Sequence, residues 1–335
     1  MNIWQVAAGD GSRDYADIFL KFGVILVGPG SEGNYFENKT VYNDSQHWAY
    51  RPFIFTIAEQ LQKNDLIVLK KPSGQQWEIL AVGSVESDYI HSETFCDVDG
   101  WDLQHCRRIN WKKPVSQTII SGLRRGTLFG INNQNALSEA KRIWEIGQDV
   151  VCDEIPNPAK ELTVDDLIDS IMEQGLPVSN SENIAKTIWK LRRIAKWYSS
   201  HGSDVGEHEI RTFLIVPLLT SLGWAEQKIK IEWNNIDVVF FDAPYSGDSK
   251  PVMIIESKRL WDGLLYAPSQ AKQYAQKYPT CNFFIVSDGI RYKLYKKENN
   301  HWNYAAYMNL MAPKRKHPYL KDVAGAVEFF LNVMA

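Results

Sequence analysis

Two short apolar runs in the second half of the chain constrain its fold most. They are IDVVFF (236–241) and PVMIIES (251–257), and the stretch DAPYSGDSKP (242–251) between them is polar and rich in turn residues. Apolar runs of this length, bounded by turn signals, are typical of buried β-strands. The simplest connection between two such strands is an antiparallel hairpin.

The pairing of these strands brings two acidic residues together. If Phe241 pairs with Val252, the register places Asp237 opposite Glu256, with Lys258 one pleat away. Carboxylates that face each other across a ladder are destabilising unless something neutralises them. A divalent cation does so, and oxygen ligands favour Mg²⁺, Mn²⁺ or Ca²⁺ over softer metals.

This arrangement predicts phosphodiester chemistry. A Mg²⁺ ion held by Asp237 and Glu256 lowers the pKa of a bound water and polarises a phosphoryl oxygen. Lys258 then orients that water or stabilises the charge that develops on the phosphate. Glu207 lies one helical turn before Arg211. We expect it to support the metal ligands without binding the metal itself, or to bind a second metal ion.

The chain divides into three segments. Residues 1–150 are rich in short strands and aromatic residues, which predicts a mostly β barrel with helical caps. Residues 151–182 form an acidic linker and helix. Residues 183–335 alternate strands with helices and carry 21 Lys and Arg against 14 Asp and Glu, a net charge of +7. The expected fold class is therefore α+β and α/β, with a basic second half that suits a polyanion.

Other features bound the cellular setting. No apolar run approaches the ~18 residues of a membrane span, and the first residues lack the pattern of a signal peptide. We expect a cytoplasmic protein without a membrane partner. The four cysteines are widely spaced, which favours small buried side chains over a zinc site or a disulfide framework.

The phrases of the second half resemble a known enzyme group. An acid on a helix, then "ID", then "ESK" resembles the PD-(D/E)xK nuclease superfamily. The chain is more similar still to the N-terminal nuclease domain of type I restriction endonuclease motor subunits, because it carries IVPLLTSLGW (215–224), Gln270 with Tyr274, and SDGIRYKLY (287–295). The resemblance covers about residues 200–300.

This resemblance implies a mixed-sheet nuclease domain flanked by helices and adds Gln270 to the catalytic residues. The proline of the motif is absent, since Ile236 precedes Asp237. Motor subunits continue into a helicase, but no Gly-x-x-x-x-Gly-Lys-Ser/Thr loop occurs in this chain. The nuclease therefore has no ATP motor of its own, and its targeting must come from the other domain or from a partner.

The first segment resembles a second group. Trp4, NDLIVL (64–69) and VGSVESDY (82–89) are similar in order to the PUA-like domains, nearest to the EVE and YTH-type readers of modified bases. This resemblance covers about residues 1–115. It implies that the domain flips a base out of the stack and holds it between aromatic side chains.

Several side chains are candidates for contact with nucleic acid. The candidate base pocket consists of Trp48, Tyr50, Tyr89, Trp101 and Asp102. The candidate phosphate contacts are Arg107, Arg108, Lys112 and Lys113. On the predicted helix 181–200, Lys190, Arg192, Arg193 and Lys196 face either DNA or water. Trp261 and Tyr266 suit core or rim packing better than base stacking.

Together these features predict a Mg²⁺-dependent DNA endonuclease of the modification-dependent restriction type, with a role in phage defence. Its substrate would be double-stranded, modified DNA, and a duplex break would need a homodimer or sequential nicks. Two alternatives stay open: a defence nuclease activated by a nucleotide signal, and a non-catalytic nucleic-acid-binding protein with a decayed nuclease fold. RNA is a further possible substrate.

Overall fold

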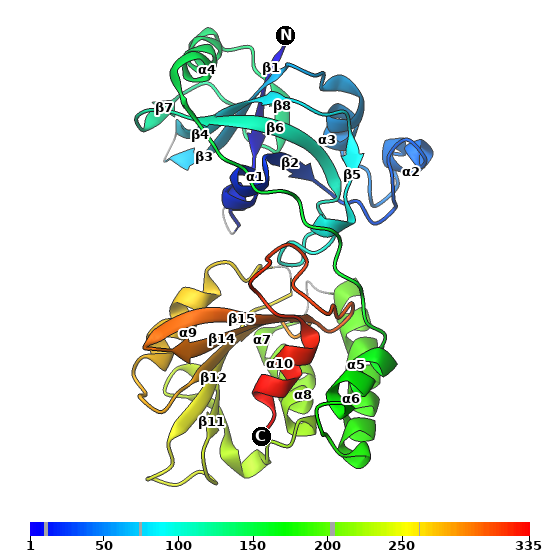
Figure 1. Ribbon diagram of the computed structural model, residues 1–335, viewed down its shortest axis with the longest axis vertical. Helices are drawn as coiled ribbons and strands as arrows, with labels where there is room; N and C mark the ends of the chain where they lie inside the picture. The colour runs from blue at the N-terminus through cyan, green and yellow to red at the C-terminus, as the bar shows by residue number, and fades with distance from the viewer. Residues whose placement is uncertain (10–12, 74–75, 202–204, 261) are drawn as a thin grey trace. The chain divides into compact units, whose positions relative to one another are not determined.

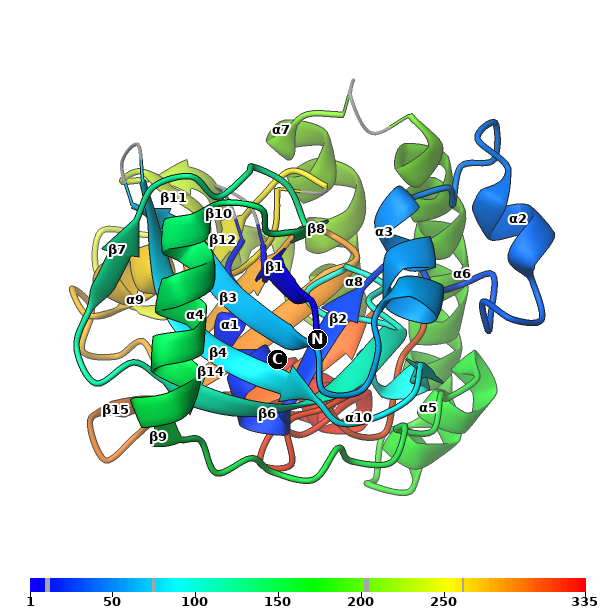
Figure 2. The same ribbon diagram turned by 90° about the horizontal axis from the view of Figure 1, so that it is seen from above.

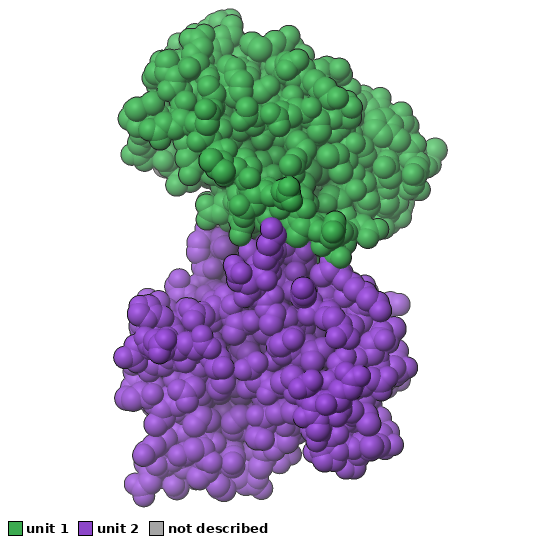
Figure 3. All heavy atoms as spheres, in the orientation of Figure 1, with its two compact units in different colours: residues 1–158 green, residues 159–335 purple. Residues whose placement is uncertain are grey.

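The computed structural model describes residues 1–9, 13–73, 76–201, 205–260 and 262–335, so Trp261 lies outside the described residues. The chain forms two compact units, Met1–Pro158 and Ala159–Ala335 (Figure 3). The division falls inside the segment 151–182. The helix of that segment belongs to the second unit.

A curled, half-barrel mixed sheet forms the first unit (Figure 1). Its strands are β1 (Ile3–Ala7), β2 (Val24–Val27), β3 (Leu66–Ser73), β4 (Gln76–Val85), β5 (Ile90–His91), β6 (His105–Lys113), β7 (Thr118–Ile120), β8 (Leu128–Gly130) and β9 (Gln148–Asp149). The main path runs β2-β6-β4-β3-β1-β8. β1 pairs with β3 in parallel, whereas β3 pairs with β4 and β4 with β6 in antiparallel fashion.

Short helices cover this sheet. They are α1 (Ala16–Phe22), α2 (Lys39–Asn43), α3 (Pro52–Phe55), the π-helix η1 (Thr56–Gln60), the 3-10 helix η2 (Glu93–Phe95) and α4 (Gln134–Ile146). Figure 2 shows α4 lying across β3 and β4. Its side chains Ala136, Ala140 and Ile143 are buried against Leu66 and Val82 of the sheet. Asn133 caps α4 by accepting a hydrogen bond from the Ala136 N–H.

A six-stranded mixed sheet organises the described part of the second unit, in the order β10-β11-β12-β13-β14-β15. The strands are β10 (Ile229–Trp233), β11 (Ile236–Phe241), β12 (Pro251–Ser257), β13 (Phe283–Ser287), β14 (Arg291–Glu298) and β15 (His301–Asn309). β12 and β13 pair in parallel, and each of the other neighbouring pairs is antiparallel.

Helices cover both faces of this sheet. They are α5 (Val164–Met172), α6 (Val178–Ser200), α7 (Glu207–Ile210), the π-helix η4 (Arg211–Ile215), α8 (Val216–Ser221), the 3-10 helix η5 (Glu226–Lys228), α9 (Ala267–Ala275) and α10 (Ala326–Val333). Val238 and Ile255 pack on one face with α5, α6, η4, α8 and α10. Val239 and Ile254 pack on the other face with α9. The alternation of side chains along β11 and β12 therefore gives each face its own core.

The structure confirms the predicted mixture of helices and sheets in both halves of the chain. The C-terminal helix α10 packs on the core of its own unit, where Phe329 and Phe330 are fully buried. No helix in the described part of the chain is both long and apolar enough to cross a lipid bilayer.

Candidate active site

The hairpin of β11 and β12 positions the two predicted acids. Val238 pairs with Ile255, which confirms the predicted register and places Asp237 across from Glu256. One detail was wrong: a bulge at Phe241 pairs this residue with Pro251 rather than with Val252. Because the bulge lies at the far end of the hairpin, it leaves the register at the acids unchanged.

Asp237 is held from two sides. Its Oδ2 accepts hydrogen bonds from the backbone N–H and the hydroxyl of Ser257, both at 2.7 Å. Its Oδ1 accepts a hydrogen bond from Nη1 of Arg211 at 3.2 Å. Both oxygens therefore have fixed directions.

Glu256 is buried, with 3% of its surface exposed. Its Oε1 accepts a hydrogen bond of 2.6 Å from Nζ of Lys258. Burial raises the pKa of Glu256, the neighbouring carboxylates of Asp237 and Glu207 raise it further, and Lys258 lowers it only in part. A buried carboxylate of this kind favours any additional cation that reaches it.

The pKa of Lys258 is also raised, although burial acts on it in the opposite direction. Burial by itself lowers the pKa of Lys258, but the hydrogen bond to Glu256 and the charges of Glu256, Glu207 and Asp237 outweigh burial, so the net pKa is raised. The ammonium group therefore stays charged at neutral pH. The backbone N–H of Lys258 donates to the carbonyl of Ser287 on β13, which fixes the chain just after β12.

Arg211 was not predicted as a partner of Asp237. It is 4% exposed and lies between Asp237 and Glu232, whose Oε1 is 3.4 Å from Nη1. Glu232 has φ +55°. Its neighbours Ile231 and Trp233 pair with β11, but Glu232 itself has no partner in the register. This irregular residue thus directs its carboxylate toward Arg211, an arrangement that the strand pattern does not indicate.

Glu207 and Gln270 lie at the edges of this group. Glu207 is half-buried at the start of α7, near enough to act on the pKa of Glu256. Gln270 is exposed in the first turns of α9. Because α9 connects the parallel strands β12 and β13, its N-terminal turns lie at the end of the sheet where Glu256 lies.

The donors suit a hard divalent cation only in part. Asp237 and Glu256 offer carboxylate oxygens, which Mg²⁺ prefers. Within the described residues, however, no three His, Cys, Asp or Glu side chains form a group that could hold a metal ion. Arg211 and Lys258 supply the countercharge to the two acids.

The first unit contains a cavity of about 240 Å³. Tyr15, Phe19, Phe53 and Trp101 line it, and the Arg13 guanidinium lies 4.2 Å from the centre of the Trp101 ring. Trp101 was predicted for a base pocket. The other aromatic residues that line the cavity were not predicted. Phe53 belongs to an apolar helical pattern, which indicates a core position and not a binding pocket.

The other predicted pocket residues lie elsewhere. Trp48 is 56% exposed and donates its indole N–H to Glu32 at 2.9 Å. Tyr50 is half-buried in the loop before α3. Asp102 accepts hydrogen bonds from the N–H groups of Gly30 and Ser31, so it supports that loop.

Tyr89 belongs to a partly buried hydrogen-bond chain. Its hydroxyl accepts from the N–H of Tyr35 at 3.1 Å and lies 2.6 Å from Nδ1 of His105. Nε2 of His105 donates to the carbonyl of Pro29. Burial lowers the pKa of His105 to about 4, so the ring is neutral and Nδ1 accepts a hydrogen bond from the Tyr89 hydroxyl.

Of the predicted phosphate contacts, Arg107 is corrected. It is 5% exposed and donates to the carbonyls of Ile57, Ala58, Leu61 and Ser87. It therefore fastens η1 to the sheet and has no role at the surface.

The other three basic residues remain accessible to different degrees. Arg108 is half-buried on β6, and Lys113 is exposed at its end. Lys112 lies 3.8 Å from Asp149 and 5.0 Å from the ring centre of Trp144. Lys113 is thus the most open of the four to a phosphate.

Comparison with known proteins adds no relative. No protein-family model matches the chain, and no curated protein matches it significantly. The chemistry of the site must therefore be argued from its own residues.

Proposed function

We propose that this protein is a Mg²⁺-dependent DNA endonuclease of the PD-(D/E)xK type. The observation that carries the proposal is the meeting of Asp237 and Glu256 at neighbouring strand ends, with the Lys258 ammonium 2.6 Å from the buried Glu256. Two acids on adjacent strands, with a lysine directly after one of the strands, suit phosphodiester hydrolysis. The resemblance of residues 200–300 to restriction nucleases supports the same class.

Asp237 and Glu256 would hold a Mg²⁺ or Mn²⁺ ion. When bound, such an ion supplies Lewis-acid polarisation and a more acidic water. Lys258 stays protonated and stabilises the negative charge that develops on the phosphate. Ser257 and Arg211 keep the Asp237 carboxylate in position, and Glu207 and Gln270 would assist from α7 and α9.

We further propose that the first unit directs cleavage to a modified base. The cavity beside Trp101 has aromatic walls and enough room for one nucleobase. Aromatic walls bind a flipped base by stacking. The resemblance of residues 1–115 to EVE and YTH-type readers supports the same role.

The test is cleavage of matched DNA duplexes that carry unmodified, methylated or hydroxymethylated cytosine, each with Mg²⁺ or with EDTA. The proposal expects Mg²⁺-dependent cleavage of modified DNA and its loss in Lys258→Ala. Cleavage without regard to modification would support the nuclease proposal and contradict the proposal that the first unit reads a modified base. A nucleotide that switches cleavage on would favour a signal-activated defence nuclease.

One observation favours a rival function. Arg211 and Lys258 already balance Asp237 and Glu256, as expected if the acids stabilise the fold of a non-catalytic nucleic-acid-binding protein. Calorimetry with Mn²⁺ separates the two. A site lost in Asp237→Asn supports the nuclease, and the absence of any site supports the rival.

A further inference from the structure

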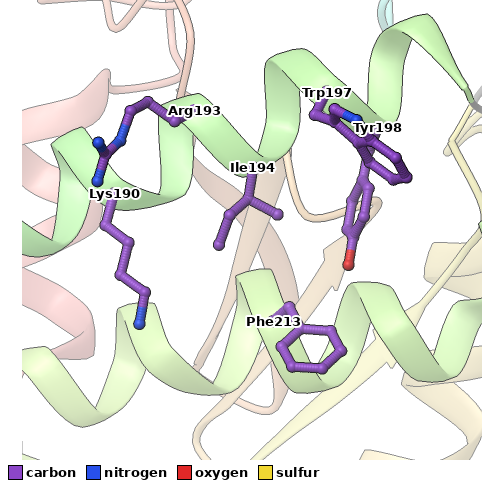
Figure 4. A pocket seen from close by; sticks show the side chains of 6 residues that line it. All are labelled: Lys190, Arg193, Ile194, Trp197, Tyr198 and Phe213. Atoms are coloured by element: carbon purple, nitrogen blue, oxygen red, sulfur yellow. The ribbon is translucent and has the colours of Figure 1, made fainter.

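A groove on the surface of the second unit has walls that suit an unpaired nucleic-acid strand. It encloses about 520 Å³ and is lined by Lys190, Arg193, Ile194, Trp197, Tyr198 and Phe213. Figure 4 shows Lys190, Ile194 and Tyr198 extending from α6 toward the helix that carries Phe213.

Large aromatic surfaces are open in this groove. Trp197 is 57% exposed and Phe213 is 49% exposed. The Trp197 ring stacks on His201 with centroids 4.4 Å apart and an interplanar angle of 16°, so its orientation is fixed before any ligand arrives. Exposed, oriented aromatic rings are the surfaces on which nucleobases stack.

The charges of the groove favour a polyanion. Among the described residues that line it are two cations, Lys190 and Arg193, and no carboxylate. One acid, Glu209, lies near the groove. Burial raises the pKa of Tyr198, and the charge of Glu209 raises this pKa further. A phosphate backbone would therefore pass along the Lys190 side of the groove, away from Glu209.

The groove is connected to the candidate active site through η4. Arg211 at the start of η4 holds Asp237, and Phe213, two residues later, lines the groove. The neighbouring Arg192 is not part of this surface, because its Nε donates to the carbonyl of Leu310 at 2.8 Å. The basic residues of α6 therefore divide between a structural tie and an open surface.

We infer that this groove binds an unpaired nucleic-acid strand, with bases stacked on Trp197 and Phe213 and phosphates beside Lys190 and Arg193. A duplex offers phosphates but hides the base faces, so the exposed aromatic rings favour single strands. The inference rests on the proposed function, since it assigns to the same unit a place for a displaced strand of the substrate.

The experiment measures fluorescence anisotropy of a labelled single-stranded DNA 20-mer with the full-length protein in EDTA, where no cleavage occurs. Trp197→Ala is expected to weaken binding roughly fivefold to 150-fold. Lys190→Ala with Arg193→Ala is expected to weaken binding and to reduce the salt dependence by about 1.4 log units per log unit of salt. Two matched controls remove equivalent groups outside the groove. They are the single variant Trp189→Ala and the double variant Lys316→Ala with Lys321→Ala, and both should bind as the wild type does.

Other results overturn the inference. The inference is wrong if Trp197→Ala and the double variant bind the single strand as the wild type does. It is also wrong if the wild type binds no single strand, even if duplex cleavage persists. Self-association of the wild type that Trp197→Ala abolishes, seen by sedimentation velocity, would instead make the groove an interface between copies. If the groove variants lose binding but the wild type never cleaves DNA, the nuclease proposal fails and the groove stands.

Discussion

The ammonium group of Lys258 donates a 2.6 Å hydrogen bond to Oε1 of Glu256, a carboxylate that is almost completely buried. The pair lies where β12 ends, beside Asp237 on β11. Breaking a buried pair leaves an uncompensated charge. This relationship makes Glu256 and Lys258 informative positions for both stability and activity.

Replacing Lys258 should slow the chemistry strongly, and the rate is compared under conditions where the variant is folded. Lys258→Ala is expected to slow Mg²⁺-dependent cleavage by about 10²- to 10³-fold, because it removes a donor aimed at developing charge. Initial rates on plasmid DNA measure the effect. Lys272→Ala, which removes an exposed lysine of α9, is the control, and an equal loss there would contradict the assignment.

The pH dependence of stability should report Glu256. Its folded-state pKa is raised above 4.5 by burial, so its contribution to stability is full below 4.5 and is lost as pH rises through the folded pKa. Glu256→Gln should therefore gain stability relative to the wild type as pH rises from about 4.5 to 8. Urea unfolding at each pH measures this, and parallel pH profiles for the two proteins would speak against a raised pKa.

Arg107 should matter for folding and not for DNA. Arg107→Ala removes four hydrogen bonds to carbonyls and is expected to cost about 2–4 kcal/mol of unfolding free energy. Lys113→Ala, at the exposed end of the same strand, should change stability by less than about 0.5 kcal/mol. Similar denaturation midpoints for both variants would refute the structural role of Arg107.

The cavity of the first unit should set the preference for modified DNA. Trp101→Ala is expected to weaken binding of a modified duplex by about 1–3 kcal/mol, because it removes a stacking surface. Trp48→Ala, which changes an exposed tryptophan outside the cavity, should leave affinity unchanged. Anisotropy with modified and unmodified duplexes gives both values, and the reverse order of effects would move the pocket to Trp48.

The hairpin at the candidate site could be predicted because its information is local. Apolar runs bounded by turn residues indicated β11 and β12, and the alternation of side chains fixed the register at Val238 and Ile255. The bulge at Phe241 could not be predicted, since nothing in the apolar pattern marks where a turn interrupts the ladder. The same holds for the contact of Arg211 with Asp237, which joins residues 26 positions apart.

The base pocket shows the opposite case. Its prediction relied on four aromatic residues and Asp102, and a single sequence does not indicate which side chains face a cavity. Tyr89 is instead tied to His105, and of the five predicted residues only Trp101 lines the cavity. For Arg107 a signal was available: it alternates with Ile109 and Trp111, which are both buried, so its position on that face of β6 indicated burial.

The metal dependence of the site is tested most directly by the rate of DNA cleavage as a function of Mg²⁺ concentration for the wild type, Asp237→Asn and Glu256→Gln. If the site depends on a metal ion, the wild-type rate saturates with Mg²⁺ and is zero in EDTA. Each variant, although folded, is then expected to lose at least about 10²-fold in rate. Cleavage that persists in EDTA, or that both variants retain, would contradict a metal-dependent site built on these two acids.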